Sequence, residues 1–566
     1  MENTDEKTLG EGYASSAVNH RGIPAEKSST GGWRSAWFII GVEVAERFAY
    51  FGIGSNLINY LTGHIGLSTA AASANVNAWV GTGAILPVLG AFVADAYLGR
   101  FRTIVVSSLI YVVGMASLTL SAFMNPIIKS KYRNHNKTEA GTSPSSLINV
   151  IFFFFSLYLV AVGQSGHKPC VQAFGADQFD VEDEKEKKAR SSFFNWWYLS
   201  LSAGINLAIL IVVYVQDNVS WALGFAIPCL TMMISLVVFI FGKRTYRFSI
   251  RNHVQENAFA RISRVFIVAF KNRRLSPGHA EMEPGPSHRR SDSIGFLRKA
   301  LLSSDAPDES ANQCSARDVE DATALIRLIP FWITTLPYAI AYSQFSTLFT
   351  KQGMSMDRDI FPGVKVSPAS LQILIGLSII VLVPFYDRVF VPIARSFTKE
   401  TSGIKMLQRI GTGMIVSAVT MVVAALVEAK RLKTAREHGL TEQKDAMVPM
   451  SIWWLIPQYL LLGLADVFTL IGMQEFFYSQ VPTELRSIGL ALYSSVLGVG
   501  SILSGVLISV IDSATIGAGG LSWFDDNLNK AHLDYFYWLL AALSAVGFCA
   551  FLFPSRSYVY NQRDGA

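Results

Sequence analysis

The chain has 566 residues, of which 51% are hydrophobic and only 16% are charged, whereas a soluble globular protein carries about 25% charged residues. This composition, with a mean hydropathy of +0.34, excludes a soluble globular fold and predicts an all-α membrane protein. The net charge of +6 lies mainly in loops, and without an extended basic domain it excludes a nucleic-acid-binding role.

Apolar runs long enough to cross a bilayer recur along nearly the whole chain. The expected spans are 34–62, 75–98, 102–124, 147–168, 190–214, 220–242, 323–351, 367–388, 405–428, 450–479, 486–512 and 534–554. Six spans on each side of a polar spacer are typical of transporters built from repeated bundles. The predicted organisation is an N-terminal cytoplasmic tail (1–33), a six-helix bundle (34–242), a cytoplasmic linker (243–322), a second six-helix bundle (323–554) and a C-terminal cytoplasmic tail (555–566).

The first expected span contains Glu43, Glu46 and Arg47 within an otherwise apolar segment. Charge at bilayer depth is costly, and membrane proteins retain it mainly for ion or proton movement. At helical spacing the three residues and Tyr50 share one stripe, and Glu43 can pair with Arg47 four residues on. We therefore expect this stripe to face protein or water and to bind protons.

The loop after the third span contains the sequon Asn136-Lys137-Thr138, a candidate glycosylation site. The basic residues of the linker place that linker and both termini in the cytosol by the positive-inside rule. With the N-terminus in the cytosol, the loop after the third span lies outside, and Asn136 with it, although this loop also carries basic residues.

The fourth span ends near Lys168, a cation that is expected to lie close to Glu43 or Glu46. Two carboxylates and two cations would then form a nearly neutral cluster. Protonating one glutamate would release its cation to hold an anionic substrate, which couples proton binding to solute binding. A static network of ion pairs is the alternative.

The linker contains one segment with helical periodicity, residues 257–270, whose apolar face is flanked by basic residues. Such a helix suits the anionic cytoplasmic leaflet of the bilayer, and packing against the underside of the protein is the alternative. Ser291 and Ser293 follow Arg289-Arg290 and are candidate sites for a protein kinase.

The second half supplies one further candidate acid and three polar side chains. Glu475, near the end of the tenth span, could pair with Lys168 across the two halves or face a cavity. Tyr338, Tyr342 and Gln344 in the seventh span are candidate hydrogen-bond donors for a substrate, with ordinary packing as the alternative.

These residues resemble a known family. Glu43-x-x-Glu46-Arg47, followed by Phe48-Ala49-Tyr50-Phe51-Gly52, resembles the signature of proton-coupled oligopeptide transporters, and residues 90–100 resemble a loop motif of the major facilitator superfamily. The plant nitrate/peptide transporter branch has similar motifs to those at Lys168-Pro169-Cys170, 174–180, Tyr386-Asp387-Arg388 and 474–478.

The resemblance implies the major facilitator fold, with twelve transmembrane helices in two six-helix bundles that rock around a central cavity. It implies that Glu43, Glu46, Arg47, Lys168 and Glu475 take part in proton coupling. Asp95 and Arg100 then form a cytoplasmic gate pair. Thr103 occupies the place where some members of the branch carry a regulatory phosphothreonine.

The predicted function is proton-coupled symport of a small solute, with low-affinity nitrate slightly favoured. Di- and tripeptides, plant metabolites and hormones are the alternatives, and a sensor that retains the fold without transport is a rival class. Nitrate-carrying relatives can place a histidine where this chain has Tyr342, which argues against that route for the anion. No residue set indicates an enzyme, a cofactor or a metal, and the plasma and vacuolar membranes are both compatible with the sequence.

Overall fold

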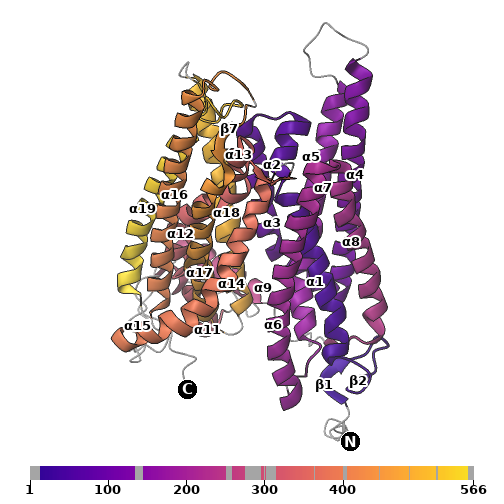
Figure 1. Cartoon of the computed structure of the whole chain (residues 1–566). Helices are drawn as coiled ribbons and strands as arrows, with labels where there is room; N and C mark the ends of the chain where they lie inside the picture. The colour runs from indigo at the N-terminus through magenta and orange to yellow at the C-terminus, as the bar shows by residue number, and fades with distance from the viewer. Residues whose placement is uncertain are drawn as a thin grey trace, which may run out of the picture.

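The computed structural model describes residues 13–133, 144–180, 182–249, 258–274, 295–298, 300, 314–361, 364–398, 404–444, 446–482, 485–517 and 521–558. These residues form two bundles of long helices that lie side by side (Figure 1). Eleven of the described helices are long and apolar enough to cross a membrane. The charged helix α1 (Gly32–Gly54) occupies the place of the first expected span. The predicted all-α membrane fold is confirmed.

The N-terminal bundle is formed by the helices that precede residue 242. They are α1 (Gly32–Gly54), α2 (Leu57–Tyr60), α3 (Thr69–Val93), α4 (Arg100–Arg133), α5 (Pro144–Ala176), α6 (Glu184–Leu207), α7 (Val213–Asn218) and α8 (Trp221–Phe241). A π-helical turn at Ala208–Val212 joins α6 to α7, so the two form one span. Helix α5 continues well beyond the expected end of the fourth span, so Lys168 lies inside a helix and not at its end.

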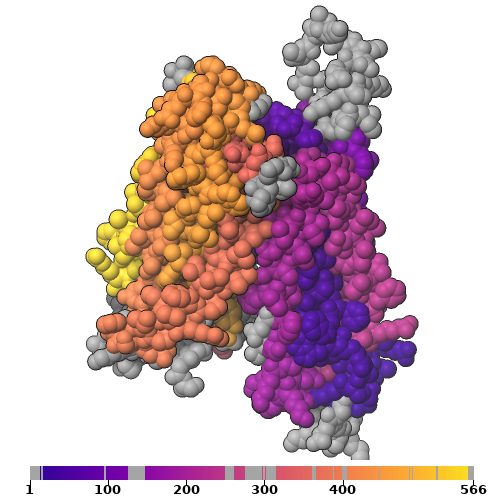
Figure 2. Space-filling view, in the orientation of Figure 1, coloured from indigo at the N-terminus to yellow at the C-terminus, as the bar shows by residue number. Residues whose placement is uncertain are grey.

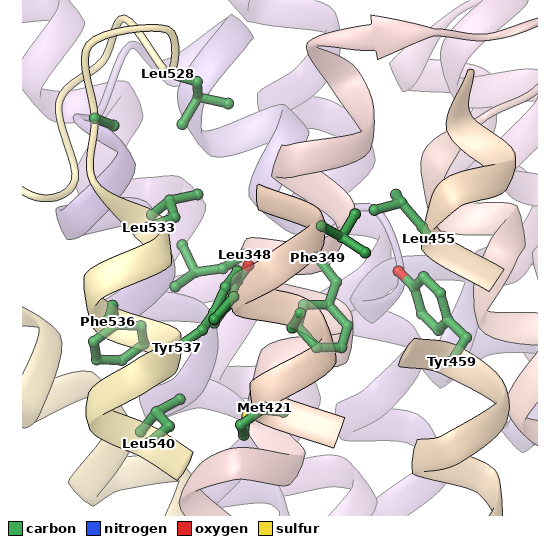
Figure 3. Close-up of a cluster of buried hydrophobic side chains, with 14 of the residues drawn as sticks. Leu348, Phe349, Met421, Leu455, Tyr459, Leu528, Leu533, Phe536, Tyr537 and Leu540 are labelled. Atoms are coloured by element: carbon green, nitrogen blue, oxygen red, sulfur yellow. The ribbon is translucent and has the colours of Figure 1, made fainter. Parts of the chain in front are cut away.

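The C-terminal bundle has the same general arrangement of long antiparallel helices. They are α12 (Ile329–Tyr342), α13 (Leu348–Met354), α14 (Ile373–Phe385), α15 (Val391–Thr398), α16 (Met406–Glu437), α17 (Ile456–Ser479), α18 (Arg486–Gly517) and α19 (Leu533–Ser557). Its core is shown in Figure 3, where the Phe349 ring packs edge-on against Tyr459 and Tyr537 at centroid distances of 5.6 and 5.5 Å. Aromatic packing thus ties α13, α17 and α19 together.

Short strands connect segments that are far apart in the chain. Strands β1 (Tyr13–Val18), β2 (Pro24–Glu26) and β3 (Phe248–Ser249) form an antiparallel sheet in the order β2-β1-β3. Sequence analysis assigned this N-terminal segment to a tail, whereas it forms a hairpin that pairs with the chain just after α8. The remaining pairs are β4 (Met356–Asp357) with β7 (Val448–Ser451), and β5 (Asp359–Phe361) with β6 (Val364–Lys365).

The linker contributes α9 (Ala258–Lys271), α10 (Gly295–Arg298) and α11 (Ala316–Ile326). Helix α9 is the amphipathic helix expected at 257–270. Its Ile262, Val265 and Ala269 are buried against the neighbouring linker helices, whereas Ile267 and Phe270 are exposed. One face of α9 therefore packs on the protein, and the other remains available to another surface.

The two bundles touch along α3 and α18, where the backbones come into contact. A Cβ atom on Gly81 would lie 2.5 Å from the carbonyl oxygen of Gly498, and a Cβ on Gly498 would lie 2.9 Å from that of Gly81. No larger side chain fits at either position without moving a helix.

We call the end where β1, β2 and α11 lie the linker end, and the other the opposite end (Figure 1). Hydrogen bonds cross between the bundles at the opposite end: Ser367 of the second bundle donates to Asp217, and Gln372 donates to the Ser55 carbonyl over 2.9 Å. Toward the linker end the helices of the two bundles diverge, and Figure 2 shows the two halves meeting along the upper part of their seam. The transporter-like fold is thus closed at the opposite end.

Candidate functional site

Three charged side chains, Glu43, Glu46 and Arg47, form a buried set inside α1, which we call the α1 charge set. The Arg47 Nε lies 2.8 Å from Glu43 Oε1 and 2.9 Å from Glu46 Oε2. Glu43 is 1% exposed, Glu46 0% and Arg47 7%. One nitrogen therefore serves two carboxylates, and with both carboxylates ionised the set carries one uncompensated negative charge.

Helix α5 brings two polar side chains to this set. Gln164 donates a hydrogen bond from Nε2 to Glu46 Oε1 over 3.1 Å. Lys168 lies one turn further on the same face of α5, and its ammonium interacts electrostatically with all three members of the α1 charge set. Lys168 is exposed and, among the described residues, no carboxylate forms an ion pair with it. The exposed Lys168 ammonium thus lies beside the α1 charge set, which carries one net negative charge when both glutamates are ionised.

Binding of a proton to the α1 charge set would break one of its two ion pairs. If a proton binds Glu43 or Glu46, that carboxyl group loses its charge, and Arg47 retains only one ionised partner. The freed donor groups of Arg47, together with Lys168, can then bind an anion. The deep burial of the carboxylates makes the change in charge energetically large.

Two tyrosines, one from each bundle, lie close to one another near the α1 charge set. Tyr50 of α1 stacks on Trp79 at a centroid distance of 5.0 Å, and Tyr342 of α12 contacts Phe345 at 4.9 Å. Both tyrosines are half-buried, and they are close enough to interact electrostatically across the two bundles. Tyr342 makes no hydrogen bond to any described side chain, so its hydroxyl is available to a ligand.

The other two candidates from the seventh span are engaged within the protein. Tyr338 is 1% exposed and donates a 2.6 Å hydrogen bond to Asp466 of α17. Gln344 is fully buried and donates a 2.8 Å hydrogen bond to Ser504 of α18, which also accepts one from Asn77 of α3. In this conformation Tyr338 and Gln344 hold helices together and do not line an open cavity.

Glu475 pairs with an arginine and not with Lys168, which was one of the two possibilities that the sequence left open. Its Oε2 lies 3.2 Å from Nη1 of Arg409, which belongs to the same bundle. Arg409 also lies over the Tyr386 ring, 4.5 Å from its centroid, and donates to the Val467 carbonyl. Glu475 is therefore held within its own bundle.

The gate candidates lie where α3 turns into α4. The Arg100 guanidinium pairs with Asp177 at the end of α5, and the side chain of Asp95 lies outside the described residues. Thr103 is 3% exposed, and its hydroxyl donates to the Gly99 carbonyl over 2.9 Å. Thr103 is thus inaccessible to a kinase in this conformation.

Three modification candidates, Asn136, Ser291 and Ser293, lie outside the described residues. Metal binding has no candidate among the residues that the structure describes, since no three or more His, Cys, Asp or Glu side chains cluster there.

Sequence analysis missed Gln164 and Arg409. Gln164 is neutral, so a search for charge inside the spans passes over it, but its four-residue spacing from Lys168 was a usable signal. Arg409 lies near the start of the ninth span, where a cation is common at the membrane surface. Only the packing of α16 against α17 shows that Arg409 reaches Glu475.

A family model described as the POT family matches residues 101–524 of the chain. Protein NRT1/ PTR FAMILY 5.14 of Arabidopsis thaliana is 65% identical over 568 residues, covering 100% of both chains. Protein NRT1/ PTR FAMILY 5.13 of the same plant is 62% identical over 569 residues, again covering 100% of both.

Solved structures with the same fold are more distant in sequence. The POT family transporter PepTSo aligns with a TM-score of 0.70 and 21% identity, covering 93% of this chain and 98% of that one. An auto inhibited POT family peptide transporter aligns with a TM-score of 0.69 and 21% identity, covering 94% and 99%. At this identity the likeness establishes the fold alone.

Proposed function

The chain belongs to the POT family of multi-pass membrane transporters, and we propose that it is a proton-coupled symporter of a small anionic solute. One observation carries the proposal: Arg47 is held by two buried glutamates while Lys168 stands exposed beside them. A purely structural ion-pair network would be expected to satisfy that second cation.

The transport cycle follows from the two states of the α1 charge set. With both glutamates ionised, Arg47 is occupied and the anion site is weak. A proton on Glu46 leaves Arg47 paired with Glu43 alone, and the anion then binds between Arg47 and Lys168. Proton and anion therefore strengthen each other's binding, which is the thermodynamic requirement for symport.

The orientation follows from the charge of the linker. Its basic residues place the linker end in the cytosol, so the described conformation opens inward and is closed toward the outside by contacts such as Asp217 with Ser367. Breaking these contacts and closing the linker end would expose the same site to the other side of the membrane.

Among solutes, we favour a small anion such as nitrate over a peptide. A zwitterionic peptide needs a carboxylate for its amino group as well as a cation for its carboxylate. Two acids of α17 in the second bundle are already engaged, Asp466 by Tyr338 and Glu475 by Arg409. Lys168, Arg47 and the Tyr342 hydroxyl are all donors, which suits an anion.

The test is uptake by purified protein in liposomes with an imposed inward pH gradient. Nitrate, a dipeptide, a tripeptide and a plant hormone acid form the solute panel. We expect nitrate to accumulate above its equilibrium level, and we expect Glu46→Gln to abolish accumulation while retaining exchange. The matched control is Glu184→Gln, because Glu184 is a surface acid with a 79% exposed side chain.

Two results would contradict the proposal. Accumulation of the peptides but not of nitrate would assign the site to peptide transport. Binding without accumulation of any solute would identify a sensor that retains the transporter fold.

A further inference from the structure

His167 is a buried titratable residue that the transport cycle above does not use. It is 0% exposed, and neither ring nitrogen forms a hydrogen bond with any residue that the structure describes. It lies inside α5, between Gln164, which binds Glu46, and the exposed Lys168. The length of α5 (Pro144–Ala176) places His167 well inside the helix and not at its end.

A buried imidazole without partners is costly. Removing a polar group from water without a compensating hydrogen bond costs about 1–3 kcal/mol in protein mutational data, and an apolar residue would avoid that cost. Neither ring nitrogen has a hydrogen-bond partner among the described residues, yet the ring is fully buried within the N-terminal bundle. Its retention there is explained if the ring binds a proton during the cycle.

The charged groups that interact with His167 lie on α1, and the titratable residues near them come from α4 and α5. Glu46 and Arg47 of α1 interact with the imidazole electrostatically. Tyr111 of α4 is also fully buried, its hydroxyl lacks a partner among the described residues, and it interacts with the same α1 charge set. Lys168 is the neighbouring cation on α5. Helix α3, which packs on the other side of α5, has no titratable side chain between residues 69 and 93.

We propose that His167 is a second proton-binding residue of the transport site, acting in competition with Arg47 for Glu46. The inference rests on the proposed function. When a proton from the aqueous space forms an N–H bond on the ring, the imidazolium becomes a new cationic partner for Glu46. The same charge repels the Arg47 guanidinium. Arg47 is then released toward the anion, although Glu46 remains ionised.

This role makes anion binding and protonation of His167 mutually favourable. An anion beside Arg47 and Lys168 offsets their positive charge and so favours the imidazolium. Two protonation events then accompany each transport cycle, one on His167 while Glu46 is still ionised and one on Glu46 itself. The inference differs from the glutamate mechanism in predicting a second titration in the same site.

The first experiment measures how nitrate uptake into liposomes depends on external pH. We expect the logarithmic slope of proton activation to fall from about two in the wild type to about one in His167→Gln. His64→Gln is the matched control, because His64 also belongs to the N-terminal bundle but stacks on Tyr60 near the opposite end. An unchanged slope and unchanged proton-to-nitrate ratio in folded His167→Gln would overturn the inference.

The second experiment does not depend on transport. Histidine is labelled with ¹⁵N in the purified full-length protein, which has nine histidines, and the signal missing from His167→Gln or His167→Asn identifies His167. We expect this signal to convert from neutral to imidazolium as the pH falls, and the conversion to shift to higher pH when nitrate is added. A ring that stays neutral throughout, with and without nitrate, would overturn the inference. A titrating ring in a protein that accumulates no solute would instead contradict the proposed function.

Discussion

At the scale of single residues, two of the buried carboxylate–arginine groups that the structure describes differ in how completely they are satisfied. Arg431 donates to both oxygens of Glu428, to Asn529 and to the Leu528 carbonyl, and Gln352 donates to Glu428. Arg47, in contrast, approaches both of its glutamates with the same Nε atom and donates one hydrogen bond, to Glu43. The Glu428 group is locked, whereas the α1 charge set can rearrange.

This contrast predicts opposite effects of the same substitution. Glu428→Gln should lower the free energy of unfolding by about 3–5 kcal/mol, because it leaves a buried arginine without its counter-charge, and should leave the pH dependence of uptake unchanged. Glu46→Gln should remove the pH dependence with a smaller loss of stability. Thermal unfolding of the purified variants, paired with uptake at several pH values, measures both effects. A large pH effect in Glu428→Gln would contradict the assignment of coupling to α1.

Tyr342 offers a second test at this scale. Tyr342→His places an ionisable ring beside the space that Tyr50 faces from the other bundle. We expect nitrate uptake to rise relative to dipeptide uptake at acidic pH, because an imidazolium attracts an anion and a neutral phenol only donates one hydrogen bond. Competition between the two solutes measures the preference. An unchanged ratio would show that position 342 does not select the solute.

The sequence located the charged site and the Glu43–Arg47 pair, but not the partner of Glu475. Glu43, Glu46, Arg47 and Lys168 were identifiable because charge is rare within apolar spans, and the structure brings them together. The partner of Glu475 was not identifiable, because Lys168 and Arg409 are both cations at plausible depth. The choice between them depends on how α16 packs on α17.

At the scale of secondary-structure elements, the spans follow from hydropathy, whereas the N-terminal sheet does not. Strand β1 (Tyr13–Val18) pairs with β3 (Phe248–Ser249), more than two hundred residues away. Its short, small-residue sequence has no clear alternation of apolar and polar side chains. The sheet is fixed instead by Arg247, which is 1% exposed, binds Glu186 through two nitrogens and donates to the Thr30 carbonyl.

Two glycines with positive φ angles offer a test of what holds the hairpin in place. Gly31 has φ 73° and Gly22 has φ 80°. A Cβ on Gly31 would lie 2.1 Å from Arg247 Nε, whereas nothing lies within 4 Å of a Cβ on Gly22. We expect Gly31→Ala to detach residues 13–30 and expose them to protease. Gly22→Ala should lower stability only by the strain of a positive φ angle and leave the hairpin attached. Equal proteolysis of the two variants would contradict the role of Arg247 as the anchor.

At the scale of the whole molecule, the two bundles are joined at the opposite end by a few polar contacts. Asp217 accepts hydrogen bonds from Asn56 of its own bundle and Ser367 of the other. Asp526 of the second bundle caps the start of α3 by accepting from the Thr69 backbone N–H over 2.9 Å. These polar contacts add to the packing of α3 on α18 and stabilise the described conformation, which is closed at the opposite end.

Removing one such contact should shift the balance of states. Asp217→Ala is expected to increase the outward-open population, since a lost hydrogen bond to a charged group changes an equilibrium by about 1.5–3 kcal/mol. Spin labels at residues 63 and 443, both exposed in the structure, report the distance between the bundles. The control is Asp512→Ala, because Asp512 bonds Ser522 within one bundle. An identical distance distribution in Asp217→Ala and the wild type would contradict the gating role.

The central claim is that the α1 charge set couples a proton to each solute that crosses the membrane. The most direct test measures internal pH and solute uptake together in the same liposomes, for the wild type and for Glu46→Gln. The account predicts that solute entry acidifies the interior in the wild type, and that solute exchange continues without acidification in Glu46→Gln. Equal acidification per solute in the two proteins would contradict it.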